Sequence, residues 1–591
     1  MTRKIKAFFR AISLSVKLKS PISFIVSILG FAAAFLPMLM SLRLADFTDK
    51  ASALFGNPDI LKTVMLSFAF LALLYIVQLL FGFVQNCCAN EDSARINRYL
   101  KESMMRLLTE IPLEYIENHG DFREKMDFVR GHAAPKAAGS ISIIFGWIYN
   151  IISFISVTFI ISVVNPWITV LLIVTCIPAV ILSMIQKDET YRSRTKWMKE
   201  GRLTLHYSDK CRTNDSMKEI RYFGLYPYLK AKWRSLIGNY VKKKNKVTRK
   251  HVIYNGIADL LRNGVYLAVV LLTALEIYNN PEKGLGTFML VVSAAGQLQG
   301  ITTTLLVNAV SIFSDLRYIE DFFDLMGTQK EIINDSSEFY TRAEIEFKDV
   351  DFVYPGSEYK ALDKLNVSIK QGEKIAIVGA NGSGKSTFVN LLCGLYKPQS
   401  GNATINGNEI TQDLAKARRS LSVIFQNFCT YQDTLRNNIA LSDPDRAMED
   451  DELLKIARQT GADEVISEQD EGLDEMIGLF SEEGKNLSGG QWQKIAVTRA
   501  LFRKNACVYI LDEPTAALDP VAEANIYRNF KNLTGNKTTI LISHRLGVTS
   551  IVDRILVFDN GRIAEDGNHS DLMGQNGIYA RMYQAQAKWY I

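Results

Sequence analysis

Four long stretches of the chain contain no Asp, Glu, Lys or Arg, and they constrain the fold more than any other feature. They cover residues 20–42, 63–90, 137–186 and 284–314. Each reaches the roughly 20 residues that an α-helix needs to cross the hydrocarbon core of a bilayer. The sequence therefore predicts that the first half of the chain contains membrane-spanning helices.

Two further features give the number of spans. The stretch 137–186 is about twice the length of one crossing, and Asn165-Pro166 near its middle is a turn pair that indicates a hairpin of two helices. Residues 252–277 are apolar except for Asp259 and Arg262 and form another candidate. Together these segments predict six spans, an even number, so both termini should lie on the same side of the membrane.

The distribution of basic residues indicates which side that is. Lys and Arg are frequent in residues 1–20 and in the connections 91–136 and 187–250, whereas the opposite connections carry only Arg43, Lys50, Lys62 and Lys283. Since basic connections stay in the cytosol, we expect a cytoplasmic-membrane protein with both termini cytosolic. Residues 1–20 contain no acids; their pattern favours an interfacial amphipathic helix over a transit peptide.

The two long basic connections should themselves be helical. They have a helical pattern and few prolines, so we expect helices that extend beyond the bilayer, with short breaks near 115–122 and 213–226. The basic run KKKNKVTRK, residues 242–250, lies beside a span, where contact with anionic membrane lipids is a simpler explanation than nucleic acid. No nucleic-acid partner is expected.

The second half of the chain has a different pattern. Short strands and turns begin near residue 341, which separates a six-span region at 21–325 and a linker at 326–340 from a second domain at 341–591. The seven cysteines show neither a disulfide framework nor metal-ligand spacing.

A glycine-rich loop identifies the chemistry of this second domain. GANGSGKSTF, residues 379–388, follows the apolar strand pattern KIAIVG and opens a helical pattern. Glycines allow backbone N–H groups to turn inward around an anion at a helix start. The spacing fits G-x-x-x-x-G-K-[ST], in which Lys385 reaches the outer phosphates of a nucleotide and the Ser386 hydroxyl ligates Mg²⁺. The predicted phosphate-binding residues are Gly379, Ala380, Asn381, Gly382, Ser383, Gly384, Lys385, Ser386 and Thr387.

Polar residues at the ends of other predicted strands supply further candidates. VYILDE, residues 508–513, would place Asp512 where it can hold Mg²⁺ through water and Glu513 where it can act as a base or orient water. Gln426 follows LSVIF and His544 follows TTILIS, at strand ends where parallel sheets form nucleotide sites, although each alone is more often structural. Tyr354 is either core or an exposed ring that stacks on a base; we favour stacking.

A second anion-binding helix start decides the family. NLSGGQWQKIAVTRAL, residues 486–501, places a serine and paired glycines before a helix. LSGGQ is the signature of ATP-binding cassette (ABC) proteins, and the chain resembles an ABC exporter half-transporter along essentially its whole length. The resemblance implies a multidomain membrane protein: an all-α six-helix transmembrane domain followed by an α/β P-loop cassette.

The resemblance also implies roles for the candidate residues and a second half-transporter as partner. In a head-to-tail dimer, the signature of one chain closes over ATP held by the glycine loop of the other, and hydrolysis resets the spans. The breaks near 115–122 and 213–226 would be coupling helices that dock on the cassettes. The implied positions are Tyr354 (base stacking), Gln426 (Q-loop and Mg²⁺), Ser488, Gly489, Gly490 and Gln491 (signature), Glu513 (catalytic carboxylate), Asp519 (D-loop) and His544 (γ-phosphate).

One departure from the family and four open alternatives remain. IGLFSEEGKN, residues 477–486, replaces the usual run before the signature. The intact hydrolytic positions favour a homodimer over a heterodimer, and an exporter of an amphipathic peptide, drug or lipid over an ATP-gated channel or sensor. Asp259 and Arg262 are either a mutual ion pair or substrate contacts. The polar residues of the last span either pack against other helices or line a water-filled cavity for the cargo. They are Gln297, Gln299, Thr302, Thr303, Thr304 and Asn308.

Overall fold

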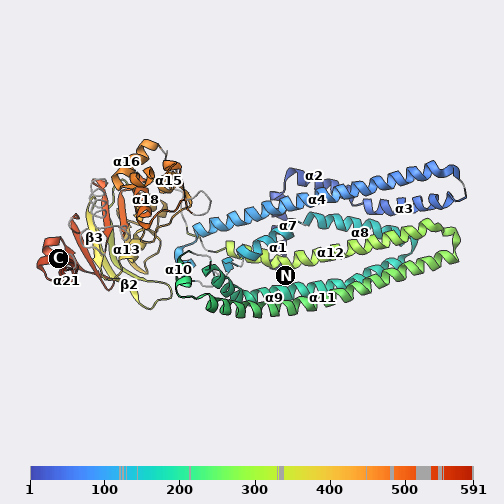
Figure 1. Ribbon diagram of the computed structural model, residues 1–591, viewed down its shortest axis with the longest axis horizontal. Helices are drawn as coiled ribbons and strands as arrows, with labels where there is room; N and C mark the ends of the chain where they lie inside the picture. The colour runs from blue at the N-terminus through green and yellow to red at the C-terminus, as the bar shows by residue number, and fades with distance from the viewer. Residues whose placement is uncertain are drawn as a thin grey trace. The chain divides into compact units, whose positions relative to one another are not determined.

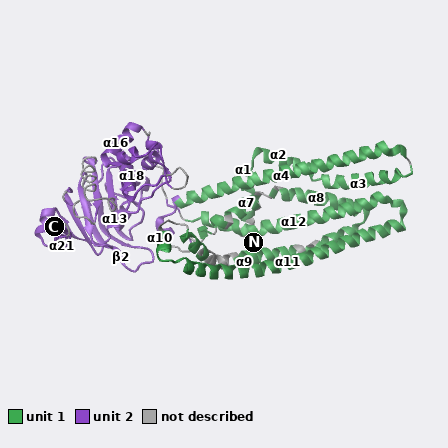
Figure 2. Ribbon diagram, in the orientation of Figure 1, with its two compact units in different colours: residues 1–108, 124–328 green, residues 109–123, 329–591 purple. Residues whose placement is uncertain are grey.

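The structure is a computed structural model of the 591-residue chain. It describes all residues except 1, 57, 119–121, 123–124, 128, 143, 212–213, 329, 332–337, 447–448, 479–484, 514–533, 544–548, 550 and 589–591. The chain divides into two compact units (Figure 2). The first unit is Met1–Leu108 with Glu124–Thr328, and the second is Thr109–Arg123 with Gln329–Ile591.

The described residues of the first unit form helices joined by short turns, with no strand among them, and the long helices run side by side (Figure 1). Helix α12 packs against α3, α8, α9 and α11 and so forms the centre of the unit. The helices are α1 (Thr2–Leu18), α2 (Pro21–Ala33), α3 (Leu36–Ala53), η1 (Pro58–Ile60), α4 (Leu61–Glu110), η2 (Val129–Ala133), α7 (Ala134–Ser142), α8 (Ile144–Val164), α9 (Pro166–Lys210), α10 (Asn214–Tyr222), α11 (Tyr226–Asn279), η3 (Pro281–Lys283) and α12 (Gly284–Met326).

The prediction of six spans agrees with this unit. Among the described residues, six helical segments are long and apolar enough to cross a membrane: Pro21–Ala53, Pro58–Glu110, Gly146–Val164, Pro166–Ser193, Tyr226–Asn279 and Pro281–Met326. Large apolar side chains on these segments are exposed, for example Leu79 and Val163 at 72% and Leu260 at 75%. Such surfaces suit lipid rather than water, because the helices satisfy their own backbone hydrogen bonds.

The predicted hairpin turn within 137–186 has a simple local cause. Helix α8 ends at Val164, and Asn165 caps α9, its side chain accepting a hydrogen bond from the Trp167 N–H at 3.1 Å. Pro166 opens α9, where a missing backbone N–H costs nothing because that N–H would have no helical partner. One residue therefore joins two spans.

The second unit contains two main sheets. The six-stranded sheet has the order β12-β11-β3-β10-β9-β6, with parallel neighbours except for the antiparallel β11–β12 pair. The four-stranded sheet is antiparallel, with the order β2-β1-β4-β5. The strands are β1 (Ile345–Val353), β2 (Lys360–Ile369), β3 (Lys374–Gly379), β4 (Ser400–Ile405), β5 (Asn408–Glu409), β6 (Leu421–Ile424), β7 (Asp433–Thr434), β8 (Met476–Ile477), β9 (Val508–Asp512), β10 (Thr538–Ile542), β11 (Arg554–Asp559) and β12 (Arg562–Gly567).

Helices cover both faces of the six-stranded sheet. On β3, Ile375 and Ile377 belong to the core that contains Phe388 of α13, whereas Ala376 and Val378 belong to a second core with α18 and α21. Because both faces are covered, the strands read as continuous apolar runs. The helices are α5 (Leu113–Asn118), α13 (Lys385–Leu392), α14 (Leu414–Ser420), α15 (Leu435–Ala440), α16 (Asp450–Thr460), α17 (Ala462–Ser467), η4 (Gly472–Asp474), α18 (Gly489–Phe502), α20 (His569–Gly574) and α21 (Ile578–Ala587).

This arrangement confirms the predicted strand–loop–helix order around residues 379–388. It also brings the carboxyl ends of β3, β6, β9 and β10 to one edge of the sheet, because the four strands are parallel. Each of these strands precedes a predicted site residue, which is the arrangement in which open α/β sheets form ligand sites.

Candidate functional site in the second unit

The glycine loop between β3 and α13 requires its glycines. Gly379, Gly382 and Gly384 have φ angles of 150°, 78° and 106°. A Cβ on Gly379 would lie 2.2 Å from the Phe558 carbonyl oxygen, and one on Gly384 would lie 2.7 Å from the Ala361 oxygen. The loop can therefore keep this conformation only without side chains at those two positions, which leaves its backbone open to a ligand.

Lys385 is folded into the loop. Its Nζ donates to the carbonyl oxygens of Gly379 at 3.0 Å and Ala380 at 2.8 Å. The side chain is buried, and loss of water contact lowers the pKa of Lys385, against the opposing pull of the Glu513 and Asp512 carboxylates. An anionic group in the loop would favour the charged form of this ammonium, because an opposite charge offsets burial.

Asp512, at the end of β9, is a buried carboxyl group with unused hydrogen-bonding capacity. It is 4% exposed, and within the described residues its Oδ1 has no hydrogen-bond partner. Burial raises the pKa of Asp512; the Glu513 charge acts in the same direction, and the Ser386 hydroxyl and Lys385 oppose it. Ser383 Oγ is a second buried atom without a partner among the described residues. Two unsatisfied oxygens beside a phosphate-type loop are suited to a hard cation.

Glu513 follows directly and is held in an uncommon conformation. Its φ is 49°, a region that residues other than glycine rarely occupy, and its N–H donates to the Ile542 carbonyl of β10 at 3.0 Å. Gln426, after β6, donates from Nε2 to Glu513 Oε2 at 2.9 Å. Backbone strain of this kind is typical of functional positions. The fold thus joins two residues that lie 87 positions apart in sequence.

Tyr354 lies at the end of β1, half-buried beside the helix that begins in the loop. Its hydroxyl bonds with Asn390 Nδ2 at 3.1 Å and Thr387 Oγ1 at 3.3 Å. The ring packs edge-on against Phe352 and Tyr396, with centroids 5.0 and 5.4 Å away. The ring therefore contacts the core and also lies next to the helix that begins in the loop. Stacking on a base stays a prediction.

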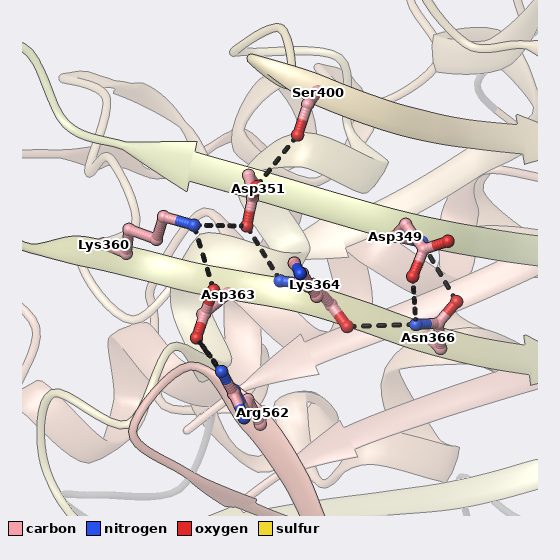
Figure 3. Close-up of polar contacts among 8 residues, drawn as sticks. All are labelled: Asp349, Asp351, Lys360, Asp363, Lys364, Asn366, Ser400 and Arg562. Atoms are coloured by element: carbon pink, nitrogen blue, oxygen red, sulfur yellow. Dashed lines mark hydrogen bonds and ion pairs between the residues drawn. The ribbon is translucent and has the colours of Figure 1, made fainter.

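A polar network fixes the hairpin that carries Tyr354 (Figure 3). Asp351 on β1 accepts from the Lys364 N–H at 2.9 Å, Lys360 Nζ at 3.0 Å and Ser400 Oγ at 3.0 Å. These hydrogen bonds, the backbone one first, lower the pKa of Asp351 to about 2. Asp363 extends the network to Arg562 of β12, in the other sheet. The two sheets are thus tied together close to Tyr354.

The signature residues form a helix start of their own. Ser488 Oγ accepts from the Gln491 N–H at 3.3 Å, and Gln491 Oε1 accepts from the Ser488 N–H at 2.8 Å, a capping box on α18. Ser488 and Gly489 are exposed. Within the described residues, no hydrogen bond joins this helix start to the glycine loop.

Several predicted positions lie outside the described residues. They are His544, Asp519, and Glu482, Glu483 and Gly484 of the unusual segment before the signature. The helix predicted near 115–122 is described as α5, apart from residues 119–121, and the one near 213–226 as α10, which begins after residues 212–213.

The first unit has a cavity of about 460 Å³ lined in part by the polar side chains of Asp259, Arg262 and Thr303. Arg262 Nη2 lies 2.8 Å from Asp259 Oδ1, and Nη1 donates to Thr303 Oγ1 at 3.0 Å. Asp259 and Arg262 are therefore an ion pair as well as part of a cavity wall. Further cavity-lining residues are Lys136, Gln186, Lys187, His251, Asn255, Asp315 and Arg317.

Two of the other polar residues predicted on the last span bond to neighbouring helices, and two bond within their own helix. Gln297 Nε2 donates to Ser41 Oγ at 3.1 Å, and Gln299 Nε2 donates to the Arg262 carbonyl at 2.8 Å. Thr302 and Thr304 donate to carbonyls one turn earlier in α12. Of the six predicted residues, Thr303 alone is among the described residues that line the cavity.

A glycine loop shaped to receive an anion, a carboxylate pair at a sheet edge and six apolar helices together indicate a membrane transporter driven by a nucleotide. Residues 362–516 match the model of the ABC transporter family. Over 431 residues the chain is 31% identical to the subtilin transport ATP-binding protein SpaT of Bacillus subtilis, covering 71% of this chain and 69% of that protein. The chain belongs to the ABC transporters, which bind and hydrolyse ATP.

Two other relatives match nearly the whole chain. The nisin transport ATP-binding protein NisT of Lactococcus lactis subsp. lactis is 26% identical, covering 95% of this chain and 92% of that protein. The ATP-dependent lipid A-core flippase of Pseudomonas fluorescens (strain Pf0-1) is 29% identical, covering 95% and 93%. The fold is similar to that of a bacterial Atm1-family ABC exporter solved with ATP bound, with a TM-score of 0.80, 24% identity and coverage of 96% and 97%.

Sequence reasoning missed two residues that contact Tyr354 or its neighbours. Tyr396 follows α13 and contacts the Tyr354 ring, and Glu117 on α5 accepts a 2.6 Å hydrogen bond from Tyr396 Oη. Neither residue belongs to a recognisable motif. The available signals were an aromatic shortly after the phosphate-loop helix and an acid within a predicted coupling helix.

Proposed function

We propose that the chain is one half of a homodimeric exporter that moves an amphipathic peptide, drug or lipid out of the cytosol by alternating access. The observation that carries this proposal is the Gln426–Glu513 hydrogen bond. It lies at the carboxyl edge of the six-stranded sheet, where β3 leads into the glycine loop. It holds a carboxylate in a strained backbone position beside the phosphate site, which a structural surface pair would not require.

Each residue then has a distinct task. The loop N–H groups and Lys385 hold the phosphates, and Tyr354 stacks on the base. Glu513 accepts a proton from, or orients, the attacking water, and Gln426 keeps that carboxylate aligned. Ser386 and Asp512 are the oxygen donors that would hold Mg²⁺, which neutralises charge on the phosphates when bound.

A second copy of the chain would complete the ATP site. Ser488, Gly489, Gly490 and Gln491 of the partner subunit would close over the phosphates, while His544 would contact the γ-phosphate. The exposure of Ser488 and Gly489 at the start of α18 supports this role, because a helix start attracts anions. The dimer would lie in the cytoplasmic membrane with both termini cytosolic, as the basic connections indicate.

The cavity in the first unit supports an amphipathic cargo. Ion-paired and hydroxyl side chains line it, whereas apolar side chains cover the outward surfaces of the same helices. The names of the relatives, which refer to subtilin, nisin and lipid A-core, support peptides and lipids as the substrate classes to try first.

The test is ATP hydrolysis by the full chain, purified alone in lipid nanodiscs, with Glu513→Gln as the matched variant. We expect turnover by the parent and a loss of about 10²-fold or more in the variant, with binding of labelled ATP retained. Undiminished hydrolysis in the variant would remove Glu513 from its role. A folded parent that binds ATP without turnover would overturn the homodimer.

Transport is tested separately in inside-out vesicles with labelled lipid and cationic or acidic model peptides. We expect uptake that requires hydrolysis and stops in the Glu513→Gln variant. Movement of solute that ATP binding alone permits, and that continues in the variant, would instead establish the gated channel.

A further inference from the structure

Helix α5 belongs to the second unit although its neighbours in sequence are α4 and η2 of the first. Its attachment includes a hydrogen bond between side chains that lie 279 positions apart: Tyr396 Oη donates to Glu117 Oε2 at 2.6 Å. A short bond to a carboxylate is stronger than one between neutral groups. Burial and the Glu117 charge raise the pKa of Tyr396, so the phenol keeps its proton and remains the donor.

The Tyr396 ring continues this contact into the nucleotide site. Phe352, Tyr354 and Tyr396 form an aromatic triad with edge-on centroid distances of 5.0, 5.4 and 5.4 Å. Phe352 is only 1% exposed and sits at the core of the unit. Tight packing around Phe352 leaves little free volume, so a shift of the Tyr354 ring has to be accommodated by Tyr396.

The far end of the path is attached to the phosphate-loop helix. Asn390 Nδ2 donates to Tyr354 Oη at 3.1 Å, and Thr387 Oγ1 lies 3.3 Å from it. Thr387 directly follows Ser386. A continuous set of contacts therefore runs from α5 through Tyr396 and Tyr354 to the helix that holds the phosphates.

We propose that Tyr396 is a positioning residue that links the nucleobase site at Tyr354 to the position of α5 through its hydrogen bond to Glu117. The inference rests on the proposed role of Tyr354 in base stacking. A base that stacks on Tyr354 fixes the orientation of its ring, the triad repacks, and Tyr396 strengthens its bond to Glu117. Helix α5 then distinguishes a purine nucleotide from a ligand that supplies phosphates alone.

The experiment measures backbone hydrogen exchange in the full chain in nanodiscs, in a Glu513→Gln background that holds ATP without turnover. The reporters are α5 and the glycine loop, and the added ligands are Mg²⁺-ATP and Mg²⁺-tripolyphosphate, which lacks a base. We expect ATP to slow exchange at both reporters and tripolyphosphate to slow it only at the loop.

Tyr396→Phe removes the hydroxyl and keeps the ring. We expect the ATP-dependent slowing at α5 to fall about tenfold, as for loss of a hydrogen bond to a charged group, while slowing at the glycine loop stays within about twofold. Glu117→Gln keeps an acceptor oxygen and should restore part of the effect lost in Glu117→Ala. Glu114→Gln, on the same helix, is the matched control and should behave as the parent.

Three results would overturn the inference. They are full ATP-dependent slowing at α5 in Tyr396→Phe, equal slowing at α5 by tripolyphosphate and ATP, or no ATP effect at α5 in the parent background. KM and kcat for ATP are also measured in the chain that keeps Glu513. These constants distinguish a failure of this inference from a failure of the proposed function. Absence of turnover there contradicts the exporter, whereas normal turnover with an unresponsive α5 contradicts only the role of Tyr396.

Discussion

Replacing Asp512 with Asn should stabilise the nucleotide-free protein while impairing its response to Mg²⁺-ATP. The carboxyl group is buried at the end of β9, and its Oδ1 has no hydrogen-bond partner among the described residues. Such a group is costly to the fold unless a ligand completes it. Asn keeps the shape of the side chain and removes the charge, so the two consequences can be measured in one variant.

The magnitude follows from the burial. An unsatisfied buried polar group costs about 1–3 kcal/mol, more if charged. Because the Asn amide is still partly unsatisfied, we expect a net gain of roughly 1 kcal/mol, or about 2 °C in melting temperature for a unit of this size. In the parent, Mg²⁺-ATP at a hundred times its Kd contributes about 2.7 kcal/mol. The Asp512→Asn variant should lose most of this stabilisation by Mg²⁺-ATP.

The dependence on pH has a defined sign. Burial raises the pKa of Asp512 in the folded state, so between the unfolded value near 3.9 and that raised value the folded chain binds more protons than the unfolded chain. The stability of the parent therefore falls as pH rises through this window, and the full cost of the charge is present above it. The advantage of the variant should disappear below about pH 4.

The assay combines thermal melting of the full chain in nanodiscs with hydrogen exchange of the β9 amides, at pH 7 and near pH 4. Asp566→Asn is the matched control and should lower the melting temperature instead of raising it. Asp566 Oδ2 on β12 lies 2.6 Å from Arg554 Nη2, and the substitution removes this ion pair. The reasoning is refuted if Asp512→Asn melts below the parent without nucleotide at pH 7. It is equally refuted if Mg²⁺-ATP stabilises both proteins to the same extent.

Three other changes have equally definite outcomes. Gly379→Ala puts a Cβ 2.2 Å from a backbone oxygen of β11 and should weaken binding of labelled ATP by about tenfold or more; Gly382→Ala, which meets no atom within 4 Å, should weaken it less. Asp351→Asn should lower the melting temperature at pH 7, and the deficit should shrink as pH falls from about 4 toward the folded-state pKa of about 2, as melting scans across that range will show. Replacing Asp259 and Arg262 together with Asn and Gln should change the concentration of cargo needed for half-maximal stimulation of ATP hydrolysis; an unchanged cargo response would assign the pair to structure.

The parts of the fold that could be predicted from the sequence are those with a local physical cause. A charge-free run of spanning length has few alternatives to a membrane helix, and Asn165-Pro166 marks the break because asparagine caps α9 and proline opens it. The glycine loop was equally accessible, since the steric need for Gly379 and Gly384 is expressed in residue type.

The parts that could not be predicted depend on residues that meet only in the folded chain. Gln426 and Glu513 are each ordinary strand-end polar residues in sequence, and their 2.9 Å contact depends on β6 and β9 pairing in parallel. For Asp259 and Arg262, one helical turn apart, the spacing allowed either an ion pair or contacts with a substrate. The structure shows the ion pair, and whether the two side chains also border a cavity depends on how α9, α11 and α12 pack.

The two elements of the second unit that we predict to bind anions, the glycine loop and the start of α18, differ in how far one chain satisfies their polar groups. At α18, the capping box uses the Ser488 hydroxyl and the Gln491 side chain, so this helix start is stable by itself and remains exposed. At the glycine loop, Ser383 Oγ of the loop and Asp512 Oδ1 at the end of β9 are buried without partners among the described residues. The start of α18 is therefore stable without a partner. The site at the glycine loop has unsatisfied buried oxygens, so a ligand that bonds to them stabilises the folded chain. ATP is therefore expected to bind the loop first, and the α18 start to dock on phosphates that are already in place.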